Sequence, residues 1–102
     1  MKTSAKKLIL SQAVRAKLAA KEPPVSESEI EQCFANRAGK LLIDNRAENG
    51  TNPYTRWFIA ETDFGRKLKI CFIPLDGGIV IKTAYDPNEQ ELRIYRKHGG
   101  LS

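Results

Sequence analysis

Hydrophobic residues near the start of the chain follow a helical spacing. Val14 and Leu18 are four residues apart, and Ser11 just before them is a residue type that caps helix N-termini. The paired prolines at positions 23 and 24 lack a backbone N–H and disfavour helical geometry in the residue before them. The pattern therefore predicts a first helix from Ser11 to about Lys21.

A second helix start follows directly. Ser26 and Glu29 have the S-x-x-E spacing of a capping box, in which each side chain bonds the backbone N–H of the other. Ile30, Cys33 and Phe34 then recur at the spacing of one buried helical stripe. Asn and Gly residues soon after Phe34 are expected to end this helix.

The rest of the chain alternates short hydrophobic runs with turn residues, which is typical of an antiparallel sheet. A polar segment at 46–55 is predicted to be a loop, and Asp86-Pro87-Asn88 is predicted to start a last helix. The expected strands cover 41–43, 56–62, 67–74 and 78–85, and the last helix covers 87–97.

Two turns predict how these strands pair. An Asp-Gly hairpin signal pairs Phe72 with Ile81, and a four-residue turn at 63–66 pairs Ile59 with Ile70. Because side chains alternate along a strand, this register divides the sheet into two faces. The predicted core face holds Trp57, Ile59, Leu68, Ile70, Phe72, Ile81, Thr83 and Tyr85. The opposite face holds Arg56, Phe58, Ala60, Thr62, Lys67, Lys69, Cys71, Lys82 and Ala84.

Basic side chains gather on that opposite face. Arg56, Lys67, Lys69 and Lys82 are predicted to share it with no acidic neighbour, so an anionic ligand would relieve their mutual repulsion. An ordinary solvent-facing sheet, where lysines guard against aggregation, is the alternative explanation.

The chain length and the element order together predict the fold class. The chain has 102 residues, of which 41% are hydrophobic, and this suits a single domain with one modest core. We expect an α+β fold with two N-terminal helices packed on a small, mainly antiparallel four-stranded sheet, and a C-terminal helix. The expected organisation is a basic arm at 1–9, one domain at 10–98 and a tail at 99–102.

Charge is distributed unevenly along the chain, which has a net charge of +5. Six of the 17 Lys and Arg residues and none of the 12 acids lie in residues 1–21, so the remaining 81 residues carry 11 bases against 12 acids. The basic segment suits an acidic partner, either nucleic acid or an acidic protein, or it is simply solvated. No apolar run reaches the roughly 20 residues of a membrane span, so we expect a cytoplasmic protein that does not bind a membrane.

Metal and cofactor chemistry has little support in the sequence. Cys33 and Cys71 are far apart and form no CxxC pair, and His98 is the only histidine. We therefore expect two reduced, semi-buried thiols, no metal site and no cofactor.

Several short segments together resemble a toxin family. They are the run Arg56-Trp57-Phe58-Ile59-Ala60-Glu61-Thr62, the turn Gly65-Arg66, the strand end Thr83-Ala84-Tyr85 and the run Glu91-Leu92-Arg93-Ile94-Tyr95. Residues 10–97 resemble the BrnT-type branch of the RelE/ParE-like toxins of type II toxin–antitoxin systems. The resemblance implies helices on one sheet face, a concave RNA-binding face on the other, metal-independent cleavage of free or ribosome-bound mRNA, and neutralisation by a small antitoxin protein. Such chains often begin with a strand, whereas a helix is predicted first here.

Metal-free RNA cleavage requires groups that move protons and groups that stabilise charge on the phosphate. We assign the scissile phosphate to Arg66 and Lys69, with Lys82 beside them, because arginine forks onto two phosphate oxygens. Tyr95 and His98 are the proton-transfer candidates, although Tyr95 also fits core packing and His98 also fits a surface position. The expected RNA-binding residues are Arg56, Phe58, Lys67, Arg93 and Arg96.

Glu61 is a further proton-transfer candidate, but the predicted register places it with the core face. The leading functional hypothesis is a ribonuclease toxin. The alternatives are a non-catalytic nucleic-acid-binding module, a protein-interaction domain that uses the same basic face, and a gyrase-directed toxin on the same fold.

Overall fold

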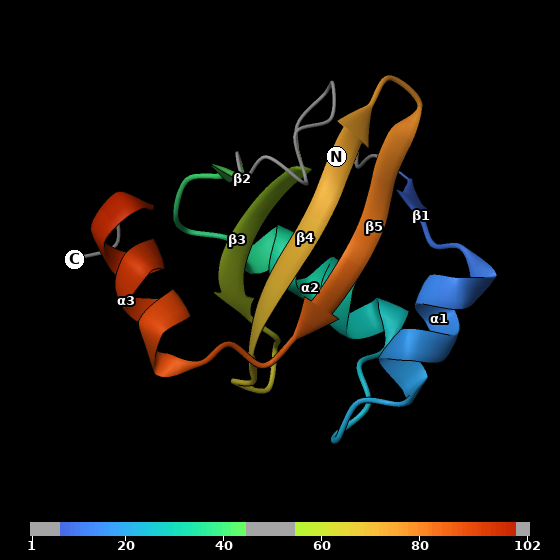
Figure 1. Ribbon diagram of the computed structural model, residues 1–102, viewed down its shortest axis with the longest axis horizontal. Helices are drawn as coiled ribbons and strands as arrows, with labels where there is room; N and C mark the ends of the chain where they lie inside the picture. Colours follow the sequence, from blue (N-terminus) through green and yellow to red (C-terminus); the bar gives the residue numbers. More distant parts are fainter. Residues whose placement is uncertain (1–6, 45–54, 100–102) are drawn as a thin grey trace.

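The computed structural model describes residues 7–44 and 55–99. These residues form three helices and one mixed five-stranded sheet with strand order β1-β5-β4-β3-β2 (Figure 1). The α+β class, the two N-terminal helices and the C-terminal helix are therefore confirmed. The loop predicted at 46–55 lies almost entirely outside the described residues. The elements are β1 (Leu8–Ile9), α1 (Gln12–Ala19), α2 (Glu27–Asn36), β2 (Leu42–Asp44), β3 (Thr55–Glu61), β4 (Lys67–Leu75), β5 (Gly78–Tyr85) and α3 (Glu89–His98).

The sheet has one strand more than the four predicted, because Leu8 and Ile9 form a short parallel strand beside β5. These two residues were expected to belong to the basic arm. Ile79 donates its backbone N–H to Lys7 O at 2.8 Å, and a Cβ on Gly78 would also lie 2.8 Å from Lys7 O. Glycine at 78 therefore permits the close approach of the two backbones. A strand of two residues is too short to leave a periodic signal in the sequence.

Helices α1 and α2 pack on one face of the sheet: α2 lies behind the strands in Figure 1 and contacts β3 and β4, and α1 lies beside β5. Ser11 and Ser26 cap them as predicted, and the Ser26–Glu29 capping box forms in both directions. Leu18 of α1 and Ile30 of α2 are at most 2% exposed and pack into the core. The caps thus fix where each helix begins, and the apolar stripes fix which side meets the sheet.

The predicted register between β3 and β4 is wrong by one residue. Phe58, and not Ile59, pairs with Ile70. The connecting turn has five residues because Thr62 belongs to it: Thr62 donates its N–H to Arg66 O at 2.8 Å, and its hydroxyl accepts the N–H of Arg66 at 3.1 Å. Gly65 supplies the left-handed conformation that the turn needs, with φ of 89°. A slip of one residue exchanges the two faces of β3.

The predicted register between β4 and β5 is correct at the hairpin and wrong beyond it. Phe72 pairs with Ile81 as predicted, but Cys71 pairs with Thr83, because a bulge follows Ile81. The extra residue of this bulge is Lys82, which therefore does not pair with Cys71. The bulge also moves Tyr85 to the face that carries its partner Lys69, opposite to the core.

Aromatic rings form the centre of the core on the face that α1 and α2 cover. Phe34 of α2 packs edge-on against Phe58 and Phe72, with ring centroids 4.8 and 5.3 Å apart. Phe58 is fully buried, so it is a core residue and not the exposed RNA-binding residue predicted. The buried hydrophobic residues are Leu18, Val25, Ile30, Cys33, Phe58, Ile59, Ala60, Leu68, Ile70, Phe72, Ile81, Ala84 and Tyr95.

Cys33 and Cys71 are thiols that are not joined in a disulfide. Cys33 is buried and donates to Ala60 O, with Sγ 3.6 Å from that oxygen. Burial raises the pKa of the Cys33 thiol to about 12. Cys71 is half-buried on the opposite face of the sheet.

Candidate functional site

The sheet face opposite α1 and α2 carries a cluster of polar side chains at its border with α3. Lys69 of β4 and Tyr85 of β5 are strand partners, and Glu91 reaches them from the first turn of α3. Glu91 Oε2 accepts from Lys69 Nζ at 3.0 Å and from the Tyr85 hydroxyl at 2.9 Å. We call these three residues the Lys69–Glu91–Tyr85 cluster.

The Lys69 ammonium is enclosed by aromatic rings as well as by Glu91. Its Nζ lies 4.5 Å from the ring centroid of Trp57 and 5.7 Å from that of Tyr85. Burial acts to lower the pKa of Lys69, but the hydrogen bond from its ammonium to Glu91 and its other neighbours outweigh this, and the pKa is raised. Lys69 is therefore a fixed positive charge at neutral pH.

Glu91 is held in the charged form by its donors. Its Oε1 accepts the backbone N–H of Asn88 at 3.0 Å, which is half of a capping box, while its Oε2 faces Lys69 and Tyr85. Burial acts to raise the pKa of Glu91, but these hydrogen bonds lower it below its ordinary value. Burial, reinforced by Glu91, raises the pKa of Tyr85, so the Tyr85 hydroxyl keeps its proton at neutral pH.

A second ammonium stands near the cluster. Lys21, just after α1, places its Nζ 5.3 Å from the ring centroid of Tyr85. No acidic partner of Lys21 is found among the described residues, whereas Lys69 is already paired with Glu91. Lys21 therefore supplies positive charge that remains available to an anionic ligand.

Arg66, predicted to bind the scissile phosphate, instead joins three segments of the protein. Its Nε and Nη2 donate to Asp86 Oδ1 at 3.1 and 2.7 Å. Its Nη1 donates to both Glu29 carboxylate oxygens at 3.2 Å and to Pro24 O at 2.7 Å. Nη2 also donates to Pro23 O at 2.8 Å. The guanidinium is thus engaged within the protein, and the side chain is only 17% exposed.

The predicted basic face does not form as a set of unpaired charges. Arg56 pairs with Phe72 and lies on the helix-covered face, because of the one-residue slip in β3. Lys67 does lie on the same face as Lys69, but it has an acidic neighbour, Glu61, 3.7 Å from its Nζ. Lys82 is exposed in the β5 bulge.

Tyr95 is part of the core and not of an open site. It is 1% exposed, its hydroxyl donates to Lys40 O at 2.7 Å, and its ring centroid lies 5.6 Å from that of Trp57. The other predicted residues of α3, which are exposed, are Arg93, Arg96 and His98.

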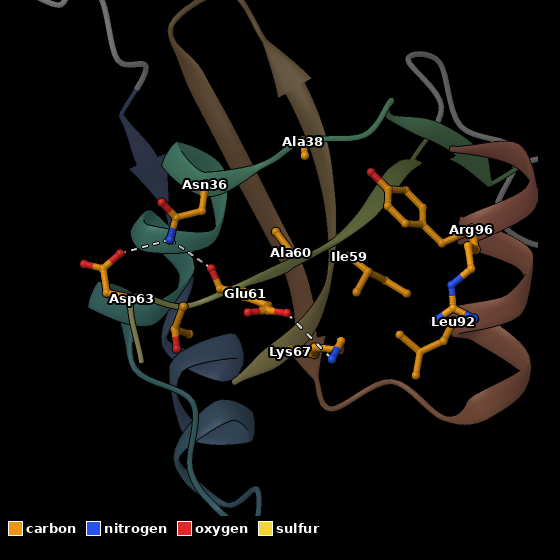
Figure 2. Close-up of a pocket in the computed structure, with 11 residues that line it drawn as sticks. Asn36, Ala38, Ile59, Ala60, Glu61, Asp63, Lys67, Leu92 and Arg96 are labelled. Atoms are coloured by element: carbon orange, nitrogen blue, oxygen red, sulfur yellow. Dashed lines mark hydrogen bonds and ion pairs between the residues drawn. The ribbon is translucent and has the colours of Figure 1, made fainter. Parts of the chain in front are cut away.

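A groove lies between α3 and the part of β3 that extends beyond its pairing with β2. It is next to the Lys69–Glu91–Tyr85 cluster. Its volume is about 630 Å³. Figure 2 shows Leu92 and Arg96 of α3 on one side, Asn36 on the other and Ile59 between them. Ile59 is the strand partner of Lys69, and Leu92 directly follows Glu91, so the groove and the cluster share a wall.

Three residues of this region were not among the site residues predicted from the sequence: Lys21, Tyr85 and Glu91. Tyr85 was assigned to the core face because the β5 bulge has no signal in the sequence. Glu91 was named only within the run that carries the family resemblance. In the structure it completes the capping box with Asn88, and it also contacts Lys69 and Tyr85 of the sheet. Its second contact depends on where α3 lies, which local spacing does not specify.

Comparisons with known proteins add no further information. The chain matches no protein-family model, no curated protein and no solved structure. Within residues 7–44 and 55–99, no group of three or more His, Cys, Asp or Glu side chains could hold a metal ion. No helix in this part of the chain is long and apolar enough to cross a membrane.

Proposed function

We propose that this protein is a metal-independent ribonuclease toxin of a type II toxin–antitoxin pair, with the Lys69–Glu91–Tyr85 cluster as its catalytic centre. The observation that carries the proposal is the hydrogen-bonded contact of one carboxylate with one ammonium and one phenol on the sheet face that α1 and α2 leave uncovered. These are the three kinds of group that cleavage by an internal 2′-hydroxyl requires.

Each member of the cluster has a separate role in the proposed reaction. Glu91 accepts the proton of the 2′-hydroxyl as the 2′-oxygen attacks the neighbouring phosphorus. Lys69 stabilises the negative charge that develops on the phosphate oxygens, and Lys21 adds to this field. Tyr85 gives its proton to the departing 5′-oxygen. The products are a 2′,3′-cyclic phosphate and a free 5′-hydroxyl.

The fold supports the proposed family. The order of elements is β-α-α-β-β-β-β-α, with helices α1 and α2 on one sheet face and the cluster on the other. Strand β1 stands before the first helix, which is where the resembling toxins often have a strand. We propose free or ribosome-bound mRNA as the substrate and a small antitoxin as the protein partner.

Binding of RNA without cleavage is the second candidate function, and one observation favours it. Glu91 already accepts three hydrogen bonds and has a lowered pKa, and both features weaken it as a base. In that case Lys21 and Lys69 would hold phosphates, and the cluster would mainly fix α3 on the sheet.

Incubation of the purified protein with RNA in EDTA separates the two candidates. The substrates are an RNA oligonucleotide, the DNA of the same sequence, and mRNA on translating ribosomes. The ribonuclease proposal predicts 2′,3′-cyclic phosphate ends on RNA and intact DNA. Salt-dependent binding that leaves every RNA intact supports the second candidate. Neither binding nor cleavage, with or without ribosomes, would contradict both.

Expression in cells tests the toxin role. Induction of the wild-type chain is expected to arrest growth. The proposal also predicts a small antitoxin reading frame next to the gene, and its co-expression is expected to relieve the arrest. Unchanged growth at a verified level of folded protein would contradict the toxin assignment.

A further inference from the structure

We infer that the groove between α3 and β3 binds a guanine base of the RNA, an inference that rests on the proposed function and adds a base preference to it. The volume of about 630 Å³ lies within the roughly 300–1,000 Å³ of pockets that enclose small ligands. Ile59 and Leu92 give the groove an apolar lining against which a flat base can pack. The shared wall with the Lys69–Glu91–Tyr85 cluster places such a base next to the scissile phosphate.

Glu61 and Lys67 present a charge pattern that matches one base. The Glu61 carboxylate and the Lys67 ammonium are 3.7 Å apart and both line the groove (Figure 2). The Watson–Crick edge of guanine has one acceptor, O6, beside two donors, N1–H and the N2 amine. Lys67 can donate to O6 while Glu61 accepts from N1–H and N2. Adenine offers a donor and an acceptor in the reverse order, so it would face Lys67 with its amine and Glu61 with N1.

The ion pair of Glu61 and Lys67 is exposed, so each side chain can exchange its partner for a ligand. The Glu61 and Lys67 side chains are 55% and 51% exposed, and exposed ion pairs of this kind are weak. The Glu61 carboxylate can therefore turn from Lys67 to a base at little cost, whereas the Lys69–Glu91 pair, whose side chains are mostly buried, is held more firmly.

The backbone around the pair is held firmly, which lowers the cost of ordering the site. Asn36 Nδ2 donates at 2.9 Å both to Glu61 O and to Asp63 Oδ1. The N–H of Asp63 in turn donates to Gln32 Oε1 at 2.9 Å. Two residues of α2 thus fix the end of β3 at the position where Glu61 enters the groove.

Arg96 completes the site from the side of α3. It is exposed, lines the groove and lies across it from Asn36 (Figure 2). A guanidinium in this position can stack on the face of a base or pair with the phosphate of the same nucleotide. Arg96 is therefore expected to contribute affinity for any nucleotide, and Glu61 to contribute the choice of base.

Binding of mononucleotides tests this inference without any requirement for cleavage. Guanosine, inosine and adenosine 5′-monophosphates are titrated into the wild type, Glu61→Gln, Arg96→Gln and the control Glu31→Gln, which removes the same charge from an exposed position on α2. The wild type and Glu31→Gln are expected to bind guanosine monophosphate roughly tenfold more tightly than adenosine monophosphate, with inosine monophosphate between them because it lacks N2. Glu61→Gln should abolish the preference, and Arg96→Gln should weaken all three without changing it.

The outcomes separate this inference from the proposed function. Equal affinity for guanosine and adenosine monophosphates in the wild type, no binding of either, or an unchanged preference in Glu61→Gln would overturn the guanine site. If the wild type cuts RNA with no preference for guanine next to the cut, the guanine site fails while the ribonuclease proposal stands. If the preference for guanosine monophosphate is found but no RNA is cut, the ribonuclease proposal fails while the guanine site stands.

Discussion

Lys69 Nζ lies 3.0 Å from Glu91 Oε2, and this contact joins β4 to the first turn of α3. The two side chains are only 15% and 19% exposed. The pair therefore has a structural role, because it anchors α3, and it also holds the cluster that we propose as the catalytic centre. Measurements of stability and of activity are needed together to distinguish these roles.

Glu91→Gln is expected to lower the free energy of unfolding at neutral pH. Glutamine keeps the volume and can still act in the capping box, but it removes the charge that Lys69 pairs with, so we expect a loss of about 1–3 kcal/mol. Glu89→Gln is the control, because Glu89 is exposed in the same helical turn. Urea denaturation of the three proteins measures the difference.

The pH dependence of that difference follows from the direction of the pKa shift. Because the pKa of Glu91 is lowered by folding, its contribution is present above its ordinary value of 4.5 and is lost as the pH falls through the folded value. The advantage of the wild type over Glu91→Gln should therefore be constant near neutral pH and shrink below about pH 4.5. An advantage that persists unchanged in strong acid would contradict this account.

Arg66→Lys is expected to destabilise the protein without affecting RNA binding. A lysine cannot bond Asp86, Glu29 and the backbone of the proline pair at once, so we expect a loss of about 1.5–3 kcal/mol. Arg93→Lys, on an exposed position of α3, should be nearly neutral for stability. Denaturation curves and RNA titrations below the melting temperature test the two halves of this prediction. Weakened RNA binding by a folded Arg66→Lys protein would contradict this prediction. It would support the role predicted from the sequence, in which Arg66 binds the scissile phosphate.

Gly39→Ala is expected to destabilise the protein, because a Cβ at 39 would lie 2.5 Å from the Tyr95 hydroxyl oxygen. Tyr95 is buried and bonded to Lys40 O, so it cannot move aside freely, and overpacking of this kind costs about 1–3 kcal/mol. Gly77→Ala is the matched control, since nothing lies within 4 Å of a Cβ at 77. Thermal unfolding of both variants checks the prediction, and equal melting temperatures would contradict it.

Local signals predicted most of the fold. Ser11, Ser26 and the Ser26–Glu29 capping box specify the starts of α1 and α2, and the hairpin signal specifies the pairing of Phe72 with Ile81. These features depend on residues that are close together in the sequence, so the sequence shows them directly.

The faces of the sheet could not be predicted in the same way. The hydroxyl of Thr62 lengthens the β3–β4 turn by one residue, and the β5 bulge at Lys82 shifts the later pairs. Each change moves the side chains beyond it to the opposite face of the sheet from the one predicted. The first moved Phe58 into the core, and the second moved Tyr85 beside Lys69. Lys69 is the one residue assigned to the scissile phosphate from the sequence that also belongs to the proposed catalytic centre.

The rate of RNA cleavage in EDTA by the wild type, Glu91→Gln and Glu89→Gln tests the central proposal most directly, with circular dichroism to establish that each variant is folded. Removal of a general base typically costs 10²–10⁴ in rate, so Glu91→Gln should cut RNA at least about 100-fold more slowly than the wild type, while Glu89→Gln keeps the wild-type rate. Cleavage by folded Glu91→Gln at the wild-type rate would contradict the assignment of the Lys69–Glu91–Tyr85 cluster as the catalytic centre.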